Sequence, residues 1–255
     1  MKVSAYAKIN LTLEVYGKRP DGYHELKSIV QPIALADEIE IERTADGSIS
    51  SDTGFADDLC VKAARVLGCG ARISVGKHIP VGGGLGGGSA DAAAVLLALN
   101  ELYDLGKSPE ELAAIGASVG SDVPALVLGQ SLRRPILMEG RGERVMPLPN
   151  EPARALVLVN PGVFCSTAEV FAHSTPRTER PDGNVNDLQD AAMALHPEIA
   201  RAYDFLVQSG AEDVMMSGSG ATVFAFAKND EDALRIVQSA EANGFKAWPT
   251  RTLSA

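Results

Sequence analysis

A glycine-rich stretch that runs directly into an apolar segment is the part of the chain best suited to bind an anion. Six glycines fall between Gly82 and Gly88, interrupted only by Leu85, and an alanine-rich run follows. Glycine has no side chain and accepts positive φ, so a ligand can approach the backbone closely. With Ser89 as the expected N-cap of a helix over residues 90–102, free N–H groups and a helix dipole would face the ligand. This arrangement favours phosphate.

The glycine pattern alone does not say which phosphate compound is bound. It is not a Walker A loop, because Gly88 occupies the position of that motif's lysine. Gly82, Gly84 and Gly87 match the GxGxxG spacing of dinucleotide-binding proteins, but a run of glycines matches many spacings. A dinucleotide-binding oxidoreductase and a flexible connection ahead of a buried helix are therefore both alternatives at this point.

Polar residues alternate with apolar ones from Lys2 to Val15, a period that predicts a half-buried strand. Lys8 and Asn10 are two residues apart, so they project from the same polar face. Such a face usually meets water. If it lines a cleft instead, Lys8 could bind a phosphate or a carboxylate.

Tyr23 and His24 follow a Pro-Asp-Gly turn at residues 20–22. A tyrosine and a histidine side by side can stack on a nucleobase and hydrogen-bond its edge. The same pair on a surface is also commonly incidental, so the turn by itself leaves both interpretations open.

Two further motifs have ordinary structural explanations. Asp122 precedes Val-Pro, which is typical of a helix N-cap with proline in the first turn. The Gly-Ser run at residues 217–220 lies ahead of an alternating segment over residues 222–227, and it predicts the turn of a hairpin. Neither pattern alone indicates catalysis.

Composition limits the class of protein. A chain of 255 residues should form one large domain or two modest ones, and its net charge of −10 argues against general binding of nucleic acid. Three cysteines without CxxC spacing (Cys60, Cys69 and Cys165) suggest neither disulfides nor a zinc site. No apolar run is long enough to span a bilayer and the N-terminus lacks a signal segment. We therefore expect a cytoplasmic protein that binds neither membranes nor nucleic acid.

The elements around these motifs follow from apolar spacing. In the first half we expect helices over residues 59–67, 90–102, 109–119 and 125–128, with strands over 2–15 and 71–77. Residues 29–41 should form two strand segments around 34–37. Residues 44–53 and 130–140 should be loops, the second exposing Arg133 and Arg134 to water or to a diphosphate.

Three prolines between Pro147 and Pro152 mark the expected boundary, which divides the chain into residues 1–150 and 151–255. The second half mixes strands over residues 155–159, 213–216, 222–227 and 245–250 with helices beginning at 166, 196 and 231. Residues 173–184 are polar and should be mobile. The whole chain is thus expected to be α+β.

Four motifs together resemble the GHMP kinase superfamily over most of the chain. They are Ala5–Leu11 followed by the turn to His24, Pro80–Ala93, Gly120–Pro124 and Met216–Ala221. The glycine and Gly-Ser motifs resemble general nucleotide-site motifs of that superfamily. The first motif is narrower, and it resembles members that phosphorylate a methylerythritol carrying a cytidine diphosphate group.

The resemblance implies a two-lobed fold, with an N-terminal nucleotide-binding lobe and a C-terminal ferredoxin-like α/β lobe. It implies ATP-dependent phosphorylation of the 2-hydroxyl of that cytidine diphosphate compound, in the non-mevalonate route to isoprenoids. We expect the protein to be a monomer or a homodimer. Magnesium would accompany ATP, with Ser89 as a possible protein ligand.

The same resemblance assigns roles to residues. Lys8 and Asp122 would be the catalytic pair, with Asp122 accepting the hydroxyl proton and Lys8 stabilising phosphate charge. Asn10, Tyr23 and His24 would contact the substrate. The residues expected to bind ATP are Pro80, Val81, Gly82, Gly83, Gly84, Leu85, Gly86, Gly87, Gly88, Ser89, Ala90, Ser217, Gly218, Ser219 and Gly220.

The chain departs from the superfamily pattern where a cytidine-stacking aromatic is expected near Asn186, because residues 184–187 contain none. That contact is either absent or supplied elsewhere. Two alternative functions also remain open. The first is another GHMP kinase, acting on a sugar, homoserine or mevalonate, and the second is a nucleotide-binding module without activity.

Overall fold

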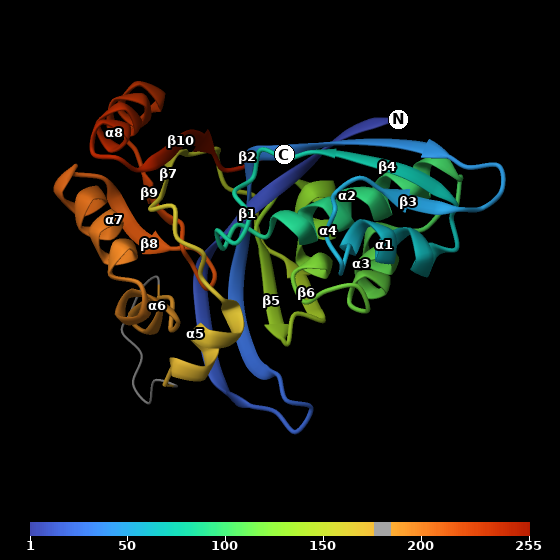
Figure 1. Cartoon of the computed structure of the whole chain (residues 1–255), viewed down its shortest axis with the longest axis horizontal. Helices are drawn as coiled ribbons and strands as arrows, with labels where there is room; N and C mark the ends of the chain where they lie inside the picture. Colours follow the sequence, from blue (N-terminus) through green and yellow to red (C-terminus); the bar gives the residue numbers. More distant parts are fainter. Residues whose placement is uncertain (176–184) are drawn as a thin grey trace.

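The structure is a computed structural model that describes residues 1–175 and 185–255. Most of the segment expected to be mobile, residues 176–184, lies outside the described residues. Figure 1 shows strands β7–β10 with helices α5–α8 on one side of the molecule, and helices α1–α4 on the other. Two long strands run between these groups.

Those two strands, β1 (Lys2–Lys18) and β2 (His24–Arg43), form an antiparallel pair along most of their length. The strand predicted here is confirmed, and its apolar face is buried at Ala5, Ala7 and Ile9, but Lys8 and Asn10 of the polar face are buried too, so this part of β1 is covered on both faces. The two segments expected around residues 34–37 are one continuous strand. Its pairing with β1 and with neighbouring strands overrides the local sequence, and Asp37 is buried within it as an acceptor for two backbone N–H groups.

The first sheet has the order β3-β4-β2-β5-β6, with β1 paired to β2. Its other strands are β3 (Ile49–Ser51), β4 (Ala71–Gly76), β5 (Ile136–Gly140) and β6 (Arg144–Pro147). Its helices are α1 (Leu59–Leu67), α2 (Gly87–Leu102), α3 (Pro109–Gly116) and α4 (Val123–Leu132). Helix α2 is buried from Ala90 to Val95 and packs on α1, α4 and β1, so it lies at the centre of this half.

Three expectations in this half are wrong in detail. Strand β3 lies within the predicted loop over 44–53, because it adds to the edge of β4 in parallel. Helix α3 ends at Gly116, before Val119. The predicted loop over 130–140 is reduced to residues 133–135, since α4 continues to Leu132 and β5 begins at Ile136. There Arg133 takes the left-handed conformation that ends α4, and its guanidinium lies 5.9 Å from the centre of the Tyr6 ring.

The second sheet is antiparallel, with the order β10-β7-β9-β8. Its strands are β7 (Ala155–Asn160), β8 (Glu212–Met216), β9 (Val223–Phe226) and β10 (Lys246–Arg251). The helices are α5 (Thr167–His173), α6 (Gln189–Leu195), α7 (Pro197–Gln208) and α8 (Asp230–Ala242). The strand order and the helical connections are those of a ferredoxin-like lobe, as expected. Helix α6 was not predicted.

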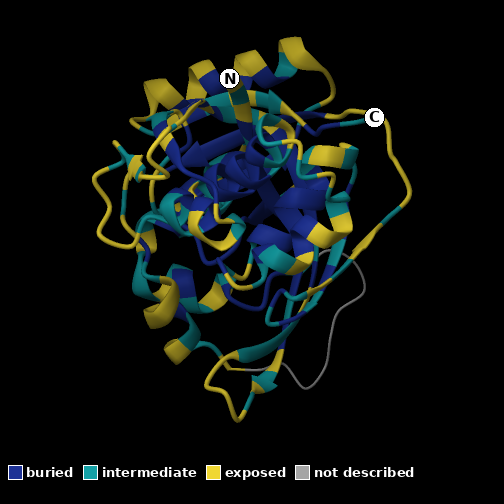
Figure 2. Ribbon diagram, turned by 90° about the vertical axis from the view of Figure 1, so that its right-hand side faces the viewer, coloured by how far each residue is buried: buried dark blue, intermediate teal, exposed yellow. Residues whose placement is uncertain are grey.

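The core of the molecule joins the two halves (Figure 2). One face of the second sheet, with Leu156, Leu158 and Phe224, packs into the cluster around α2. Its other face, with Val157 and Val159, packs under α7 and α8. Among the described residues, no helix is both long and apolar enough to cross a membrane.

Candidate active site

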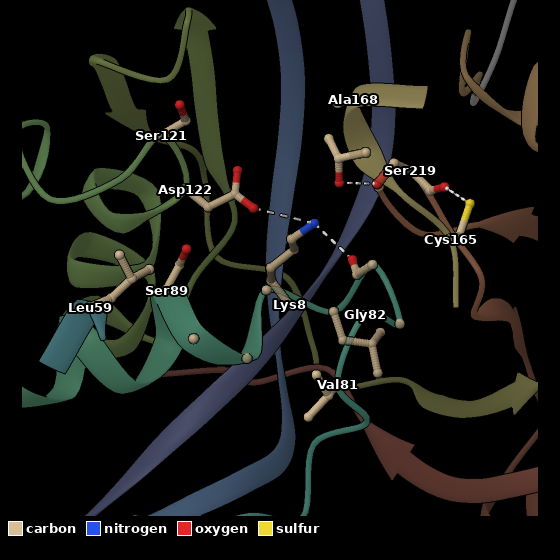
Figure 3. A pocket seen from close by; sticks show the side chains of 18 of the residues that line it. Lys8, Leu59, Val81, Gly82, Ser89, Ser121, Asp122, Cys165, Ala168 and Ser219 are labelled. Atoms are coloured by element: carbon tan, nitrogen blue, oxygen red, sulfur yellow. Dashed lines mark hydrogen bonds and ion pairs between the residues drawn. The ribbon is translucent and has the colours of Figure 1, made fainter. Parts of the chain in front are cut away.

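A cavity of about 1070 Å³ opens where the glycine-rich loop meets the second half of the chain. Side chains from β1, the glycine loop, the segment before α4, helix α5 and the Gly-Ser turn all line it. Figure 3 shows Lys8 at its centre, between Asp122 on one side and the glycine loop on the other. The topology therefore brings together motifs that are far apart in the sequence.

The glycine loop connects β4 to α2, in the predicted order helix, strand, loop, helix. Ser89 is not the N-cap of α2. The helix begins at Gly87 and is preceded by Gly86 in the left-handed conformation, which places Ser89 inside the first turn. Ser89 is thus free to face the cavity that it lines. The N-terminal N–H groups of a 16-residue helix lie at this end of the cavity.

The loop rests on the Gly-Ser turn between β8 and β9. The Ser217 hydroxyl donates to the Gly84 carbonyl over 3.0 Å, and the Thr222 N–H donates to the Gly83 carbonyl over 3.1 Å. Gly84 has a φ of +74°, and a Cβ there would collide with the Ser217 carbonyl oxygen. Glycine at this position lets two backbone segments meet at the cavity floor.

Lys8 is buried, with a side chain only 4% exposed, and its Nζ lies 3.7 Å from Asp122 Oδ2. The ammonium donates to Asn10 Oδ1 at 2.6 Å and to the Gly84 carbonyl at 2.9 Å. Burial lowers the pKa of Lys8, although the neighbouring Asp122 opposes that shift. Asn10 in turn donates to the Ser28 hydroxyl at 2.8 Å, so its amide holds the lysine in place.

The structure separates the two interpretations of Asp122. The residue does precede α4 at the N-cap position, but its side chain makes no capping hydrogen bond. Its carboxylate, about 31% exposed, faces Lys8 and the cavity instead. The explanation as a helix cap is therefore wrong for this side chain.

A buried charge cluster below the glycine loop was missed by the sequence analysis. Lys77 Nζ donates to Asp37 and, at 2.8 Å, to Asp91, whose other oxygen has no partner among the described residues. Burial raises the pKa of Asp91 to about 7 despite the lysine. The signal that could have found this cluster is a single carboxylate inside the apolar run of α2, four residues after Gly87.

The opposite end of the cavity is aromatic. The His24 ring stacks on Phe171 of α5 with 4.8 Å between ring centres, and both residues line the cavity. Tyr23 is about half exposed, and the Arg141 guanidinium lies 5.1 Å from the centre of its ring. Sequence reasoning did not find Phe171 or Arg141, because neither lies in a motif.

Most of the residues expected to bind ATP line the cavity, namely 80–89 and 218–220. Two of those expected do not. Ala90 is fully buried within α2, and Ser217 is buried where it holds Gly84. Arg133 and Arg134 also lie away from the cavity. Its lining cations are Lys8, Lys18, Lys77 and Arg141, from the described residues.

Comparison with known proteins supports the motifs independently. Residues 55–130 match the family model described as GHMP kinases N terminal domain, and residues 173–246 match GHMP kinases C terminal. A curated relative from Aromatoleum aromaticum is 41% identical, and the alignment covers 98% of this chain and 92% of that protein. Another, from Citrifermentans bemidjiense, is 37% identical over 99% of both chains. Both are named 4-diphosphocytidyl-2-C-methyl-D-erythritol kinase.

Solved structures agree with this fold. A crystal structure of 4-(cytidine 5'-diphospho)-2C-methyl-D-erythritol kinase matches with a TM-score of 0.85 and 33% identity, covering 100% of both chains. A mevalonate kinase matches over 100% of both chains with a TM-score of 0.71 but only 14% identity, so it shows the fold alone. The dinucleotide-binding alternative has no support, because α2 is followed by α3 and α4 rather than by a parallel strand.

Proposed function

The chain belongs to the 4-diphosphocytidyl-2-C-methyl-D-erythritol kinases of the GHMP kinase family, and on that premise we propose how its cavity performs the reaction. ATP is the phosphoryl donor, and the acceptor is the 2-hydroxyl of 4-diphosphocytidyl-2-C-methyl-D-erythritol. The observation that carries the proposal is the buried Lys8 beside Asp122, in one cavity with a glycine loop at one end and aromatic rings at the other.

The glycine loop and the start of α2 bind the ATP phosphates. Phosphoryl transfer depends mainly on positioning and on stabilising charge, and backbone N–H groups at a helix N-terminus supply both. Residues 82–88 offer a backbone without side chains except at Leu85, which is buried beneath the loop. The turn at 218–220 faces the same space and completes the phosphate end.

Asp122 accepts the proton of the attacking hydroxyl, and Lys8 stabilises negative charge on the transferring phosphate. The distance between Lys8 Nζ and Asp122 Oδ2 leaves both groups close enough to act on one hydroxyl. Asn10 accepts from Lys8 and donates to Ser28, which fixes the lysine, and its second amide N–H can donate to the substrate in the cavity that Asn10 lines.

Magnesium would accompany ATP, and the residues that would face it lie at the glycine-loop end of the cavity. Mg²⁺ prefers oxygen ligands and usually keeps several waters and the nucleotide phosphates. The Ser89 hydroxyl and the Asp122 carboxylate point into the same part of the cavity, which suits such an ion (Figure 3). No cluster of three acidic, histidine or cysteine ligands occurs within residues 1–175 and 185–255, so the phosphates would supply most of the ligands. The ion neutralises phosphate charge.

The cytidine group lies at the aromatic end, against Tyr23, His24 and Phe171. Phe171 lines the cavity and stacks on His24, so it can supply the aromatic ring that the sequence lacks near Asn186. A pyrimidine can stack on such rings. With the base at the aromatic end and the ATP phosphates at the glycine loop, the methylerythritol group lies between them, near Asp122.

The experiment measures ADP release from ATP and magnesium with the cytidine diphosphate substrate, and with mevalonate, homoserine and galactose as competing alcohols. Wild type should turn over only the first. The Asp122→Asn variant should lose roughly 10²- to 10⁴-fold in kcat, with little change in melting temperature, because this side chain caps no helix. Lys8→Met should lose activity similarly but should also melt earlier, because it removes one partner of the pair with Asp122 and takes away the donor to Asn10 Oδ1 and to the Gly84 carbonyl.

Each other result has a defined meaning. Turnover of a different alcohol would retain the kinase chemistry and reject the substrate. ATP binding without turnover of any alcohol would favour the module without activity. If Asp122→Asn keeps the wild-type kcat and only has a lower melting temperature, Asp122 has no part in the mechanism.

A further inference from the structure

Asn186 is buried, at 4% exposure, just before α6, and its side chain reaches into the Gly-Ser turn. Its Nδ2 donates to two carbonyl groups, those of Met216 and Gly218, at 2.8 Å each. Its Oδ1 accepts from the Leu188 N–H at 3.0 Å. Both amide protons are therefore used to hold alternate carbonyls of one turn, a geometry that a carboxylate or an apolar side chain does not provide.

The segment that carries Asn186 is itself fixed to β1. The Leu13 N–H donates to the Val185 carbonyl at 2.7 Å, and the Asp187 N–H donates to the Leu13 carbonyl at 2.8 Å. The Asp187 carboxylate accepts from the Val15 N–H at 2.8 Å. Strand β1 also carries Lys8, so the side chain of Asn186 and the proposed catalytic lysine share one rigid support.

The hydrogen bond to Gly218 sets the direction of the next N–H. In a trans peptide the C=O and N–H groups point in opposite directions. The Met216 carbonyl accepts from Asn186, and the N–H of Ser217 accordingly points away to the Thr222 carbonyl. By the same geometry the Ser219 N–H points away from Asn186. Within the described residues no protein acceptor takes it, and Gly218, Ser219 and Gly220 line the cavity.

The turn is free to adopt a different peptide orientation without this bond. Rotation of the Gly218–Ser219 peptide changes ψ of Gly218 and φ of Ser219, and among the described residues Asn186 is the one hydrogen-bond donor to the Gly218 carbonyl. The rotated peptide would turn a carbonyl oxygen, instead of an N–H, towards the ATP phosphates. An oxygen dipole aimed at a phosphate repels it, whereas a fixed N–H stabilises its charge.

We propose that Asn186 is a positioning residue that orients the Gly218–Ser219 peptide so that the Ser219 N–H donates to a phosphate of bound ATP. The inference rests on the proposed function only in taking ATP as the ligand at this end of the cavity. It assigns a role in the phosphate site to a residue that touches neither ATP nor the acceptor.

The test replaces Asn186 with aspartate, which keeps the shape but exchanges two donors for an acceptor. ATP binding is measured directly by calorimetry, together with kcat and KM for ATP. Asn186→Asp should weaken ATP binding at least tenfold, raise KM for ATP and leave KM for the alcohol near the wild-type value. Because a protonated aspartate regains one donor, the ratio of variant to wild-type affinity should recover as the pH falls.

Asp187→Ala is the matched control. It removes the carboxylate that accepts from the Val15 N–H in the same segment, while the Asn186 side chain that donates to the Met216 and Gly218 carbonyls is kept. It should lower the melting temperature at least as much as Asn186→Asp while leaving ATP affinity within about twofold of wild type. Asn186→Gln, which keeps the amide on a longer chain, should be closer to wild type than the aspartate variant.

Wild-type ATP affinity in Asn186→Asp, or an equal loss of ATP affinity in both 186 and 187 variants, would overturn the proposal. A loss without any recovery at low pH would also contradict it. These results are distinguishable from failure of the proposed function, because ATP binding is measured without the acceptor.

Discussion

At the scale of single residues, the cavity places charged groups where water is scarce, and burial rather than pairing decides their behaviour. Lys8 has a lowered pKa even with Asp122 beside it, and Asp91 has a raised pKa even with Lys77 beside it. Both shifts favour the neutral form of a buried group. Such shifts are common at functional sites, and here they lie on both sides of the glycine loop.

The charge cluster at Asp91 predicts a specific dependence of stability on pH. Its folded pKa of about 7 is above the ordinary value of 3.8, so the native state binds the proton more tightly than the unfolded chain. This contribution to the free energy of unfolding is fully present below about pH 4 and is lost as the pH rises through 7. Asp91→Asn has no carboxylate to ionise and should not show this loss. The free energy of unfolding of the variant minus that of wild type should therefore rise by about 2 kcal/mol from pH 5 to pH 8.

Urea unfolding of both proteins at pH 5 and pH 8 measures that difference. The groups that interact with Asp91 are Lys77, Asp37 and Cys60. Burial raises the pKa of the Cys60 thiol, which keeps it neutral across this range. A difference between variant and wild type that does not change with pH would show that Asp91 is ionised in the native state at both values.

Several site residues were predictable and others were not, for a physical reason. The glycines lie in a motif whose local pattern suits phosphate binding, Lys8 and Asp122 were assigned roles through the family resemblance, and the structure brings all of them to one cavity. Asp37, Phe171 and Asn186 act through partners far along the chain, so nothing in their own neighbourhood marks them. Asp122 shows the opposite error, because its local pattern suggests a helix cap that tertiary structure does not use.

At the scale of elements, the glycine loop is hydrogen-bonded to the turn between β8 and β9 through the carbonyls of Gly83 and Gly84. The start of α2 was misplaced by the sequence analysis because serine is a good N-cap, whereas Gly86 at φ +68° begins the helix earlier. The Lys8 side chain lies 3.0 Å from where a Cβ on Gly86 would be, so a side chain at this position would be crowded as well as strained. The preference of serine for the N-cap position therefore did not predict where α2 begins.

Gly84→Ala should disrupt the contact between loop and turn. An added Cβ would meet the Ser217 carbonyl oxygen and, at 2.8 Å, the Gly220 carbonyl oxygen, and both are backbone atoms that cannot rotate away. We expect a loss of stability of roughly 3 kcal/mol or more, because overpacking adds to the strain of positive φ, and a large fall in ATP affinity. Thermal unfolding and ATP calorimetry measure these effects.

Gly106→Ala controls for the strain alone. Gly106 has a φ of +65°, close to that of Gly84, but nothing lies within 4 Å of its Cβ position. It should cost only about 1 kcal/mol. Equal losses at the two positions would mean that the collision with the turn is relieved by movement, and that the loop does not depend on close contact.

At the scale of the whole molecule, the boundary at residues 150 and 151 separates two sheets but not two cores. Leu156, Leu158 and Phe224 of the second sheet pack into the cluster around α2. In the other direction, Leu13 and Val15 of β1 belong to the cluster of the second half. The proline-rich segment connects the two sheets, and apolar residues from each side of it pack in the core of the other half. Sequence composition reveals the connecting segment but not this shared packing.

This shared packing predicts that the two halves fold as one unit. The fragment 151–255 would lack Leu13 and Val15, together with the β1 backbone that pairs with residues 185–187. The fragment 1–150 would expose the face of its core that Leu156, Leu158 and Phe224 cover. Each fragment alone should therefore lack a cooperative thermal transition, and the intact chain should unfold in a single transition in calorimetry.

Binding of ATP provides the second half of this test. Because both halves line the cavity, a saturating nucleotide should raise the temperature of the whole transition and not of one part. Two separate transitions, of which ATP shifts only one, would show that the halves are independent domains and that the boundary at 150 and 151 divides the folding units as well as the sheets. A single shifted transition would instead mean that strand β1 and the second sheet bind the lobes into one cooperative structure.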